Sequence, residues 1–193
     1  MAGEHQAPDK SIADLVAELE AAGESGRRVA VFGAARNVGT TLTAVALARA
    51  LAQASRVVLV DLAFTSPNLA AFAIDRAGPG MVDLVRGQAS FGQIISRDRT
   101  SRAHIIAAGR IDADVRAVLA SERLRIALEA LSRTYDHVVI DAGAMPESVE
   151  AVAGLATRAI LVIPGMATTA AGEGLVTAGF KNVTVHRGTP DLE

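Results

Sequence analysis

The segment VAVFGAARNVGTTL, residues 29–42, combines a short apolar run, a glycine-containing turn and the start of a helix. This is the layout of a phosphate-binding loop, G-x-x-x-x-G-K-[ST]. In such a loop backbone N–H groups hold phosphates at a helix N-terminus, the lysine reaches the terminal phosphates and the hydroxyl ligates Mg²⁺. Gly39 and Thr41 match the pattern, whereas Thr40 stands where the lysine is expected. The segment therefore predicts a phosphate-binding turn without its usual lysine.

The rest of the loop is compatible with the backbone shape of such a turn. Asn37 falls where many phosphate loops carry glycine, and asparagine enters the left-handed backbone region at low cost. Loss of the lysine removes a charge-assisted hydrogen bond worth about 1.5–3 kcal/mol, or roughly one to two orders of magnitude in affinity. Arg36 is the only cation in the loop and is the candidate to compensate in part. The predicted nucleotide-binding residues are Arg36, Asn37, Val38, Gly39, Thr40, Thr41 and Leu42. The alternative is a plain strand-to-helix turn in which Gly39 only packs.

Composition indicates one soluble α/β domain. The chain has 193 residues, of which 50% are apolar but only 3% aromatic, so a single large core must be built from small aliphatic side chains. A net charge of −2, without any long cluster of Lys or Arg, argues against nucleic acid as a partner. The absence of cysteine excludes disulfides and thiolate metal sites and fits the reducing cytoplasm. The four histidines show no ligand spacing.

The sequence also predicts that this domain itself makes no membrane contact. No apolar run reaches the roughly 18–20 residues of a membrane span, because Arg158 interrupts the best candidate, residues 151–164. The first ten residues lack the apolar centre of a signal peptide. A longer parent chain anchored at the cytoplasmic face of a membrane remains compatible with these observations.

Patterns of strand and helix alternate along the chain. Ser11 is placed to cap a helix that ends near Gly23. Helical spacing recurs over 44–51 and 124–135, and shorter helical pieces are expected at 81–86 and 91–96. Apolar runs of strand length occupy residues 29–32, 57–60, 105–107, 138–140, 160–163 and 183–185. This alternation predicts an α/β three-layer sandwich, a mostly parallel central sheet flanked by helices, with right-handed crossovers. The predicted divisions are a lead and helix (1–26), a phosphate-loop NTPase-like domain (27–187) and a tail (188–193).

Two aspartates come directly after predicted strands. Asp61 ends the run VVLVD and Asp141 ends HVVID. In open parallel sheets ligands lie beyond the carboxyl ends of the strands, so both are placed to reach a Mg²⁺ held by Thr41, directly or through water. Either aspartate alone is more often a strand-end cap. Together with the loop, they favour a nucleotide-binding ancestry, with Thr41, Asp61 and Asp141 as the predicted metal contacts.

From residue 27 to about 185 the chain resembles the bacterial tyrosine kinase domains of polysaccharide co-polymerases. These belong to the deviant phosphate-loop ATPases that position cell-division and plasmid-partition machines. The family loop A-x-P-G-E-G-K-[ST] is matched at Ala34, Gly39 and Thr41 and departed from at Arg36, Asn37, Val38 and Thr40. The second motif, V-D-A-D-L-R-R-P-x-L, is matched at Val60, Asp61, Pro67 and Leu69. Ala63 replaces its second aspartate, and Thr65 and Ser66 replace its arginines.

Two further segments carry the resemblance. The family pattern G-L-x-D-V-L-x-G is echoed between Gly80 and Gly87. A long run that ends in Y-D-x-V-I-I-D is echoed by Leu119, Ser121, Arg123, Leu128, Leu131, Tyr135, Asp136, Val138, Val139, Ile140 and Asp141.

The resemblance implies ATP or ADP with Mg²⁺ as cofactor and protein-tyrosine phosphorylation as the family activity. Catalysis of phosphoryl transfer depends on positioning and charge stabilisation, and this chain has lost both the loop lysine and the carboxylate at Ala63. Each loss removes on the order of hundred-fold or more in turnover, so we expect weak or absent activity and weak or lost nucleotide binding, and assign no catalytic residue. The only tyrosine, Tyr135, is predicted to lie in the core, and the family's C-terminal tyrosine cluster is not matched.

The leading hypothesis is a catalytically degenerate, pseudokinase-like cytoplasmic domain of an exopolysaccharide chain-length or export regulator. It would act as an assembly or regulatory module, as a homo-oligomer, with the polysaccharide polymerisation and export machinery as partner. One alternative is a slow ATP-binding switch or weak tyrosine kinase or ATPase, in which Arg36 replaces the lysine. Another is a degenerate positioning ATPase of the pilus-assembly type, against which segments 67–69 and 80–87 favour the polysaccharide family.

Overall fold

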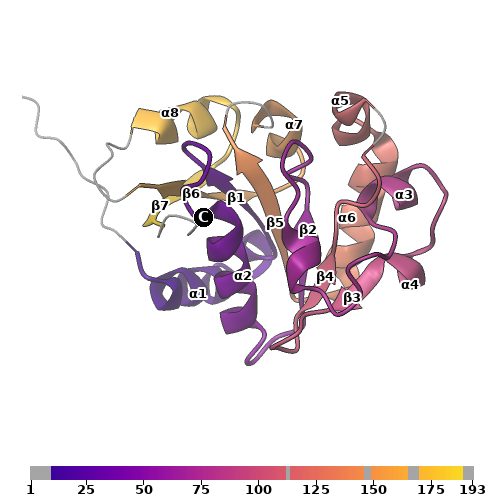
Figure 1. Cartoon of the computed structure of the whole chain (residues 1–193). Helices are drawn as coiled ribbons and strands as arrows, with labels where there is room; N and C mark the ends of the chain where they lie inside the picture. The colour runs from indigo at the N-terminus through magenta and orange to yellow at the C-terminus, as the bar shows by residue number, and fades with distance from the viewer. Residues whose placement is uncertain (1–9, 112–113, 146–148, 165–169, 189–193) are drawn as a thin grey trace, which may run out of the picture.

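A central sheet of seven strands organises the chain (Figure 1). The computed structural model describes residues 10–111, 114–145, 149–164 and 170–188. The strand order is β3-β4-β2-β5-β1-β6-β7, and every neighbouring pair is parallel except β3 and β4. The strands are β1 (Arg28–Gly33), β2 (Val57–Asp61), β3 (Ile95–Arg97), β4 (His104–Ile106), β5 (His137–Ala144), β6 (Arg158–Ile163) and β7 (Asn182–Arg187). The predicted α/β fold with a mostly parallel sheet is confirmed.

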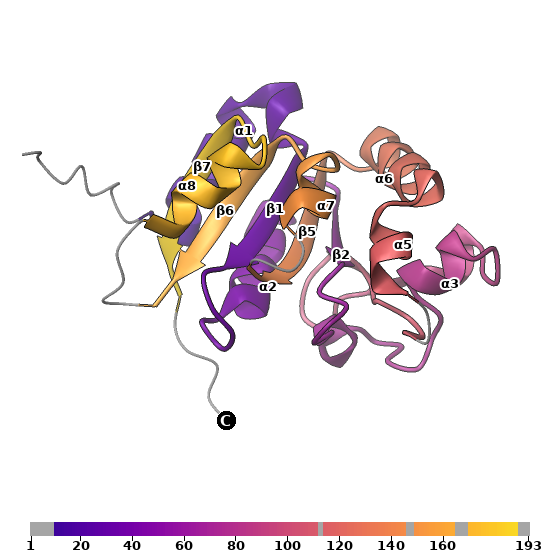
Figure 2. The ribbon, with the colours of Figure 1, turned by 90° about the horizontal axis from the view of Figure 1, so that it is seen from above.

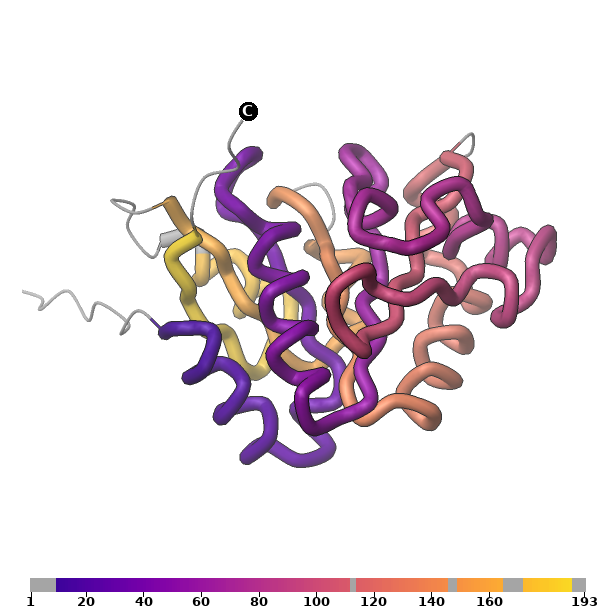
Figure 3. Tube along the Cα trace, turned by 60° about the horizontal axis from the view of Figure 1, so that its bottom comes forward, coloured from indigo at the N-terminus to yellow at the C-terminus, as the bar shows by residue number. Residues whose placement is uncertain are grey.

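Helices cover both faces of this sheet, as Figure 2 shows from above. The helices are α1 (Ile12–Ala21), α2 (Thr40–Leu51), α3 (Met81–Val85), α4 (Phe91–Ile94), α5 (Val115–Leu119), α6 (Glu122–Thr134), α7 (Val149–Ala153) and α8 (Ala170–Thr177). Two 3₁₀ turns, η1 (Gly23–Gly26) and η2 (Leu69–Phe72), complete the described elements. Helices α1 and α2 lie side by side on one face (Figure 3). Helices α3 and α5–α8 belong to the other face.

The hydrophobic core consists of two clusters, one on each face of the sheet, because successive side chains of a strand point to opposite faces. Val29 and Val31 of β1 face the layer of α1 and α2, whereas Ala30 and Phe32 face the opposite layer. A strand buried on both faces is therefore apolar throughout. This is why short continuous apolar runs marked the parallel strands in the sequence.

Helix α1 contacts the edge of the sheet formed by β6 and β7 through hydrogen bonds and an ion pair. Ser11 caps α1, accepting from the backbone N–H of Asp14 at 3.2 Å, as predicted. Glu18 accepts from the guanidinium of Arg158 at 2.7 Å and from the hydroxyl of Thr184 at 3.0 Å. The Nδ1 of His186 lies 2.6 Å from the carbonyl oxygen of Lys10. Residues at both ends of the described chain therefore meet at the β7 edge. The division into lead, domain and tail stays a prediction.

The region between α3 and β4 corrects one expectation. The predicted helix over 91–96 ends at Ile94, and Ile95–Arg97 instead forms β3, which pairs antiparallel with β4. A three-residue strand is too short to show a period of two, and its pairing with β4 depends on contacts that the local pattern does not contain. None of the described helices is long and apolar enough to cross a bilayer.

Candidate nucleotide site

The turn between β1 and α2 has the backbone shape of a phosphate cradle. Asn37 adopts a positive φ of 58°, and Gly39, the N-cap residue of α2, has a φ of 85°. The predicted left-handed conformation of Asn37 is thus confirmed. The first N–H groups of a helix have no acceptor within it, so those of Thr40, Thr41 and Leu42 are available to an anion.

Thr40 lies under this turn rather than over it. Its residue exposure is 9%, and a Cβ atom added to Gly33 would lie 2.2 Å from its Oγ1 and 3.0 Å from Cγ2 of Val38. The hydroxyl therefore packs against the end of β1, where only a glycine leaves room for it. The position of the expected lysine is occupied by a neutral, inward-facing side chain, while Arg36 is exposed on the loop. The importance of Gly33 was missed in the sequence, although a glycine that ends an apolar run was visible there.

Thr41 and Asp141, predicted as partners, are in direct contact. The Oγ1 of Thr41 donates to Oδ2 of Asp141 at 2.7 Å, and the N–H of Gly143 donates to Oδ1 at 3.1 Å. Asp141 is fully buried near the carboxyl end of β5, and Thr41 belongs to the first turn of α2. The sheet thus brings together two residues that are a hundred positions apart in the sequence.

Asp61 is the neighbour of Asp141 across the sheet. The two residues are register partners of β2 and β5. The carboxylate of Asp61 accepts from the N–H groups of Ala63 and Leu69, each at 3.1 Å, and so holds the segment that follows β2. Burial, together with the negative charge of Asp141, raises the pKa of Asp61 to about 7. Asp61 therefore takes up a proton near neutral pH unless a cation lies beside it.

These three side chains fit the ligand preferences of Mg²⁺. This ion usually retains several waters and is bound by one or two carboxylates and by phosphate oxygens, which suits Thr41, Asp61 and Asp141 beside a phosphate loop. Among the described residues there is no group of three or more His, Cys, Asp or Glu that would bind a metal by itself. The site suits a metal that arrives with a nucleotide.

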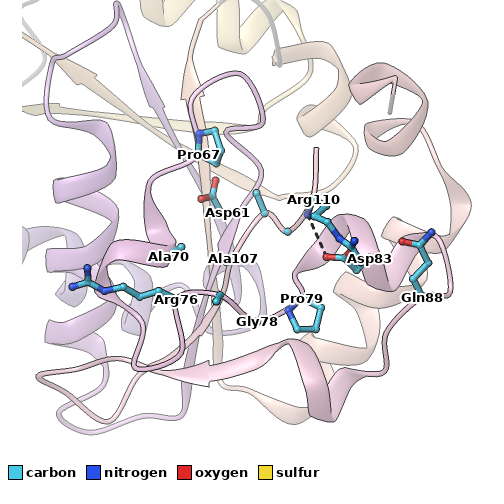
Figure 4. Close-up of a pocket in the computed structure, with 13 residues that line it drawn as sticks. Asp61, Pro67, Ala70, Arg76, Gly78, Pro79, Asp83, Gln88, Ala107 and Arg110 are labelled. Atoms are coloured by element: carbon cyan, nitrogen blue, oxygen red, sulfur yellow. Dashed lines mark hydrogen bonds and ion pairs between the residues drawn. The ribbon is translucent and has the colours of Figure 1, made fainter. Parts of the chain in front are cut away.

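A cavity of about 640 Å³ opens beside Asp61 (Figure 4). Its walls come from the segments after β2 and β4, and small residues such as Ala70, Gly78 and Ala107 line much of it. Asp83, itself buried, accepts from the N–H groups of Gly80 at 2.8 Å and Arg110 at 3.3 Å and thereby ties the two walls together. Figure 4 shows the guanidinium of Arg110 folded over Asp83. The sequence resemblance included Gly80 and Asp83 but did not predict this cavity.

A second polar pair lies at the amino ends of strands β4 and β5, opposite the carboxyl ends where the phosphate loop is located. The hydroxyl of Tyr135 is 2.6 Å from Nδ1 of His104, and the two rings meet edge to face. Burial raises the pKa of Tyr135, whereas burial and the charge of Arg97 lower the pKa of His104. Tyr135 is a core residue, as predicted, with 7% of its surface exposed. No feature of the sequence indicated its contact with His104.

Comparison with known proteins supports a kinase-type fold. No protein-family model matches the chain. A tyrosine-protein kinase of Acinetobacter johnsonii, Ptk, is 29% identical over 114 residues, which are 58% of this chain and 16% of the kinase. The chain therefore matches only a small part of that kinase's length.

Solved structures agree over almost the whole chain. The kinase domain of the Escherichia coli tyrosine kinase ETK superposes with a TM-score of 0.82 at 17% identity, covering 95% of this chain and 76% of the kinase domain. The BceF tyrosine kinase domain gives a TM-score of 0.77 at 25% identity, covering 92% and 77%. The septum site-determining protein MinD of Pyrococcus horikoshii, solved with Mg-ADP, gives 0.64 at 21% identity, covering 82% and 67%. The chain is thus similar in sequence to part of a bacterial tyrosine kinase, and it shares its fold with the tyrosine kinase domains of ETK and BceF and with MinD.

Proposed function

We propose that this chain is a nucleotide-binding regulatory or assembly domain that has retained the kinase fold but has little or no phosphoryl-transfer activity. The observation that carries the proposal is the contrast within one loop. The amide cradle and the Thr41–Asp141 contact are formed, whereas Thr40 packs against Gly33 and contributes no charge.

In this proposal residues 36–42 hold the phosphates. The free N–H groups of the first turn of α2 and the positive end of its dipole attract a diphosphate. Thr41 and Asp141 hold Mg²⁺, with Asp61 beside them directly or through water, and Arg36 supplies the cation nearest the loop. The metal neutralises phosphate charge when it binds, and its arrival favours the ionised form of Asp61.

Transition-state stabilisation is where the site is deficient. Phosphoryl transfer depends on charges aimed at the transferring group. Thr40 and Ala63 provide none at positions where the family carries a lysine and an aspartate. Binding therefore depends on the backbone, which is intact, while turnover depends on side chains that have been replaced.

The cellular role follows from the same relationship. We place the domain in an exopolysaccharide chain-length or export regulator, at the cytoplasmic face of the membrane. It would assemble with further copies and with the polymerisation machinery. Residues 27–187 would form the folded module. The support is the kinship with kinase domains, combined with a site better suited to binding than to turnover.

Calorimetry with Mg-ADP and Mg-ATP, alongside a sensitive phosphate-release assay, tests the proposal. We expect measurable binding that is weakened in Thr41→Ala and Asp141→Ala but unchanged in the surface variant Glu129→Ala. We expect phosphate release by the native protein no greater than by the first two variants. Absence of binding at millimolar nucleotide, or clear turnover that these variants abolish, would contradict the proposal.

A weak kinase or ATPase is the second candidate, and one observation favours it. The cavity of about 640 Å³ beside the carboxylate of Asp61 can admit an acceptor group, which would place this carboxylate as a general base. Asp61→Asn separates the two functions. A slow turnover that Asp61→Asn abolishes even at saturating Mg-ATP, where weaker nucleotide binding no longer limits the rate, would establish the enzyme.

A further inference from the structure

The residue that follows β7 packs on the outside of the phosphate loop. The N–H of Gly188 donates to the carbonyl oxygen of Ile163 at 3.1 Å, which continues the pairing of β7 with β6. A Cβ atom at this position would lie 2.1 Å from the carbonyl oxygen of Val38 and 2.5 Å from Cγ1 of Val162. The backbone of Gly188 is outside the left-handed region. Space, rather than backbone conformation, is therefore what requires glycine here.

The loop is consequently held from two sides at Val38. Its side chain is buried next to Gly33 at the end of β1, and its carbonyl oxygen faces Gly188. The residues on either side, Asn37 and Gly39, both have positive φ angles. Val38 is thus flanked by two residues with positive φ. It contacts Gly33 through its side chain and Gly188 through its carbonyl oxygen.

The geometry of the peptide between Val38 and Gly39 connects Gly188 with the phosphate cradle. A peptide unit is planar, so the carbonyl oxygen of Val38 and the N–H of Gly39 turn together. The N–H of Gly39 belongs to the turn that precedes α2, where phosphate is expected to bind. Anything that displaces the Val38 oxygen also changes the direction of the Gly39 N–H.

We propose that Gly188 is a positioning residue for the phosphate loop. By allowing the chain after β7 to lie directly against the Val38 carbonyl, it fixes the peptide plane whose N–H faces the phosphates. The inference rests on the proposed nucleotide binding and adds to it a residue from the opposite end of the chain. A hydrogen bond to a charged group lost by misdirection corresponds to roughly ten- to hundredfold in affinity.

Gly188→Ala tests this role, with Gly92→Ala as the matched control. An added Cβ at Gly92, in α4, would meet nothing within 4 Å. Amide hydrogen exchange without nucleotide should show reduced protection in Gly188→Ala at Ala34 and Thr43, whose N–H groups donate to the carbonyl oxygens of Val162 and Gly39 at 2.8 and 2.9 Å, with β2 and β5 unchanged. Affinity for Mg-ADP should fall roughly ten- to hundredfold in the same variant. Gly92→Ala should match the native protein in both measurements.

A double variant distinguishes the loop contact from simple overpacking. Val162→Ala removes the side-chain part of the clash but leaves the contact with the Val38 carbonyl, so Gly188→Ala with Val162→Ala should fold and keep the loop defect. Full recovery in the double variant, or native protection and affinity in Gly188→Ala, would overturn the role of Gly188. If the native protein binds no nucleotide, the proposed function fails, and the exchange measurement still decides whether Gly188 holds the loop.

Discussion

Thr40 leaves the phosphate loop without a lysine while the turn keeps the backbone shape of such a loop. The turn keeps its left-handed residues and its free amides, because these depend on Asn37, Gly39 and the glycine beneath them. The charge depended on a single side chain. The hydroxyl of Thr40 packs against the end of β1 and carries no charge.

Restoring the lysine should restore affinity. The side chain at position 40 is buried beside Gly33. The longer side chain of Thr40→Lys has to leave this packing position and extend toward the loop amides, the direction in which Cα–Cβ bonds of a helix tilt. We expect Mg-ADP to bind roughly ten- to hundredfold more tightly, which corresponds to about 1.5–3 kcal/mol. Calorimetry measures this directly. Thr40→Met, of similar length and without charge, is the control, and equal affinities of the two variants would refute the prediction.

Asp61 should make the stability of the nucleotide-free domain depend on pH. Its pKa is about 7 in the folded protein against a usual 3.8. Between these values the folded state holds a proton that the unfolded chain releases, so stability falls as pH rises from about 4 to about 7. Urea unfolding from pH 4 to 8 without Mg²⁺ measures the slope. Asp61→Asn should reduce that slope by an amount on the order of 1–3 kcal/mol over this range. An unchanged slope would contradict the shift.

Helix α2 is connected to the β3–β4 hairpin by an ion pair between a half-buried arginine and a buried aspartate. Two nitrogens of Arg49 donate to the two carboxylate oxygens of Asp98, at 3.0 and 2.9 Å, and the guanidinium lies over the ring of Phe72. Asp98 is 4% exposed. Its burial favours the neutral form, but hydrogen bonds from Arg49 and Ser101 outweigh it and hold the pKa at about 2.

Loss of this pair should be measurable and pH-dependent. Because the pKa of Asp98 is depressed, its contribution is present above pH 4 and disappears as pH falls through about 2. We expect Asp98→Asn to lower the unfolding free energy at pH 7 by about 1–3 kcal/mol, with the gap closing toward pH 2. Asp136→Asn, which removes an exposed pair with Arg56, should have a much smaller effect. Equal losses in the two variants would show that burial is not the cause.

Elements buried on both faces were the most predictable from the sequence. Six strands were visible as apolar runs, because a parallel strand between two helix layers needs no alternation. Strand β3 was not, since three residues carry no period. The Arg49–Asp98 pair was also missed because nothing local relates residues that lie 49 positions apart. At the site, the positions of the loop and of both aspartates could be predicted, because they come directly after apolar strands. The roles of Gly33 and Gly188 could not, because they depend on close contacts with residues that are distant in the sequence.

At the scale of the whole molecule the sheet separates the phosphate loop from the only tyrosine. The loop follows β1 at the carboxyl edge, while Tyr135 precedes β5 at the amino edge. Six residues of extended chain between Tyr135 and Asp141 correspond to roughly 20 Å. A phosphate bound at the loop is therefore out of reach of Tyr135 in the same molecule.

Tyr135 should accordingly remain unphosphorylated in the folded domain. Tyr135 is 7% exposed and its hydroxyl contacts His104, so another molecule would also have little access to it. Mass spectrometry after prolonged incubation with Mg-ATP should find no phosphate on this residue. Tyr135→Phe is the control for background signal. A phosphopeptide that contains Tyr135, absent from the variant, would contradict this arrangement.

The meeting of Lys10 with His186 has a mechanical consequence. A force applied to the protein through residues 10 and 188 would load β7 from its end, so that its hydrogen bonds would open one after another. The bond from Gly188 to Ile163 would carry the load first. Since Gly188 also lies against Val38, tension would loosen the phosphate loop before the sheet itself yields. We therefore expect a pull on residue 188 to reach the turn between β1 and α2 before it reaches the core.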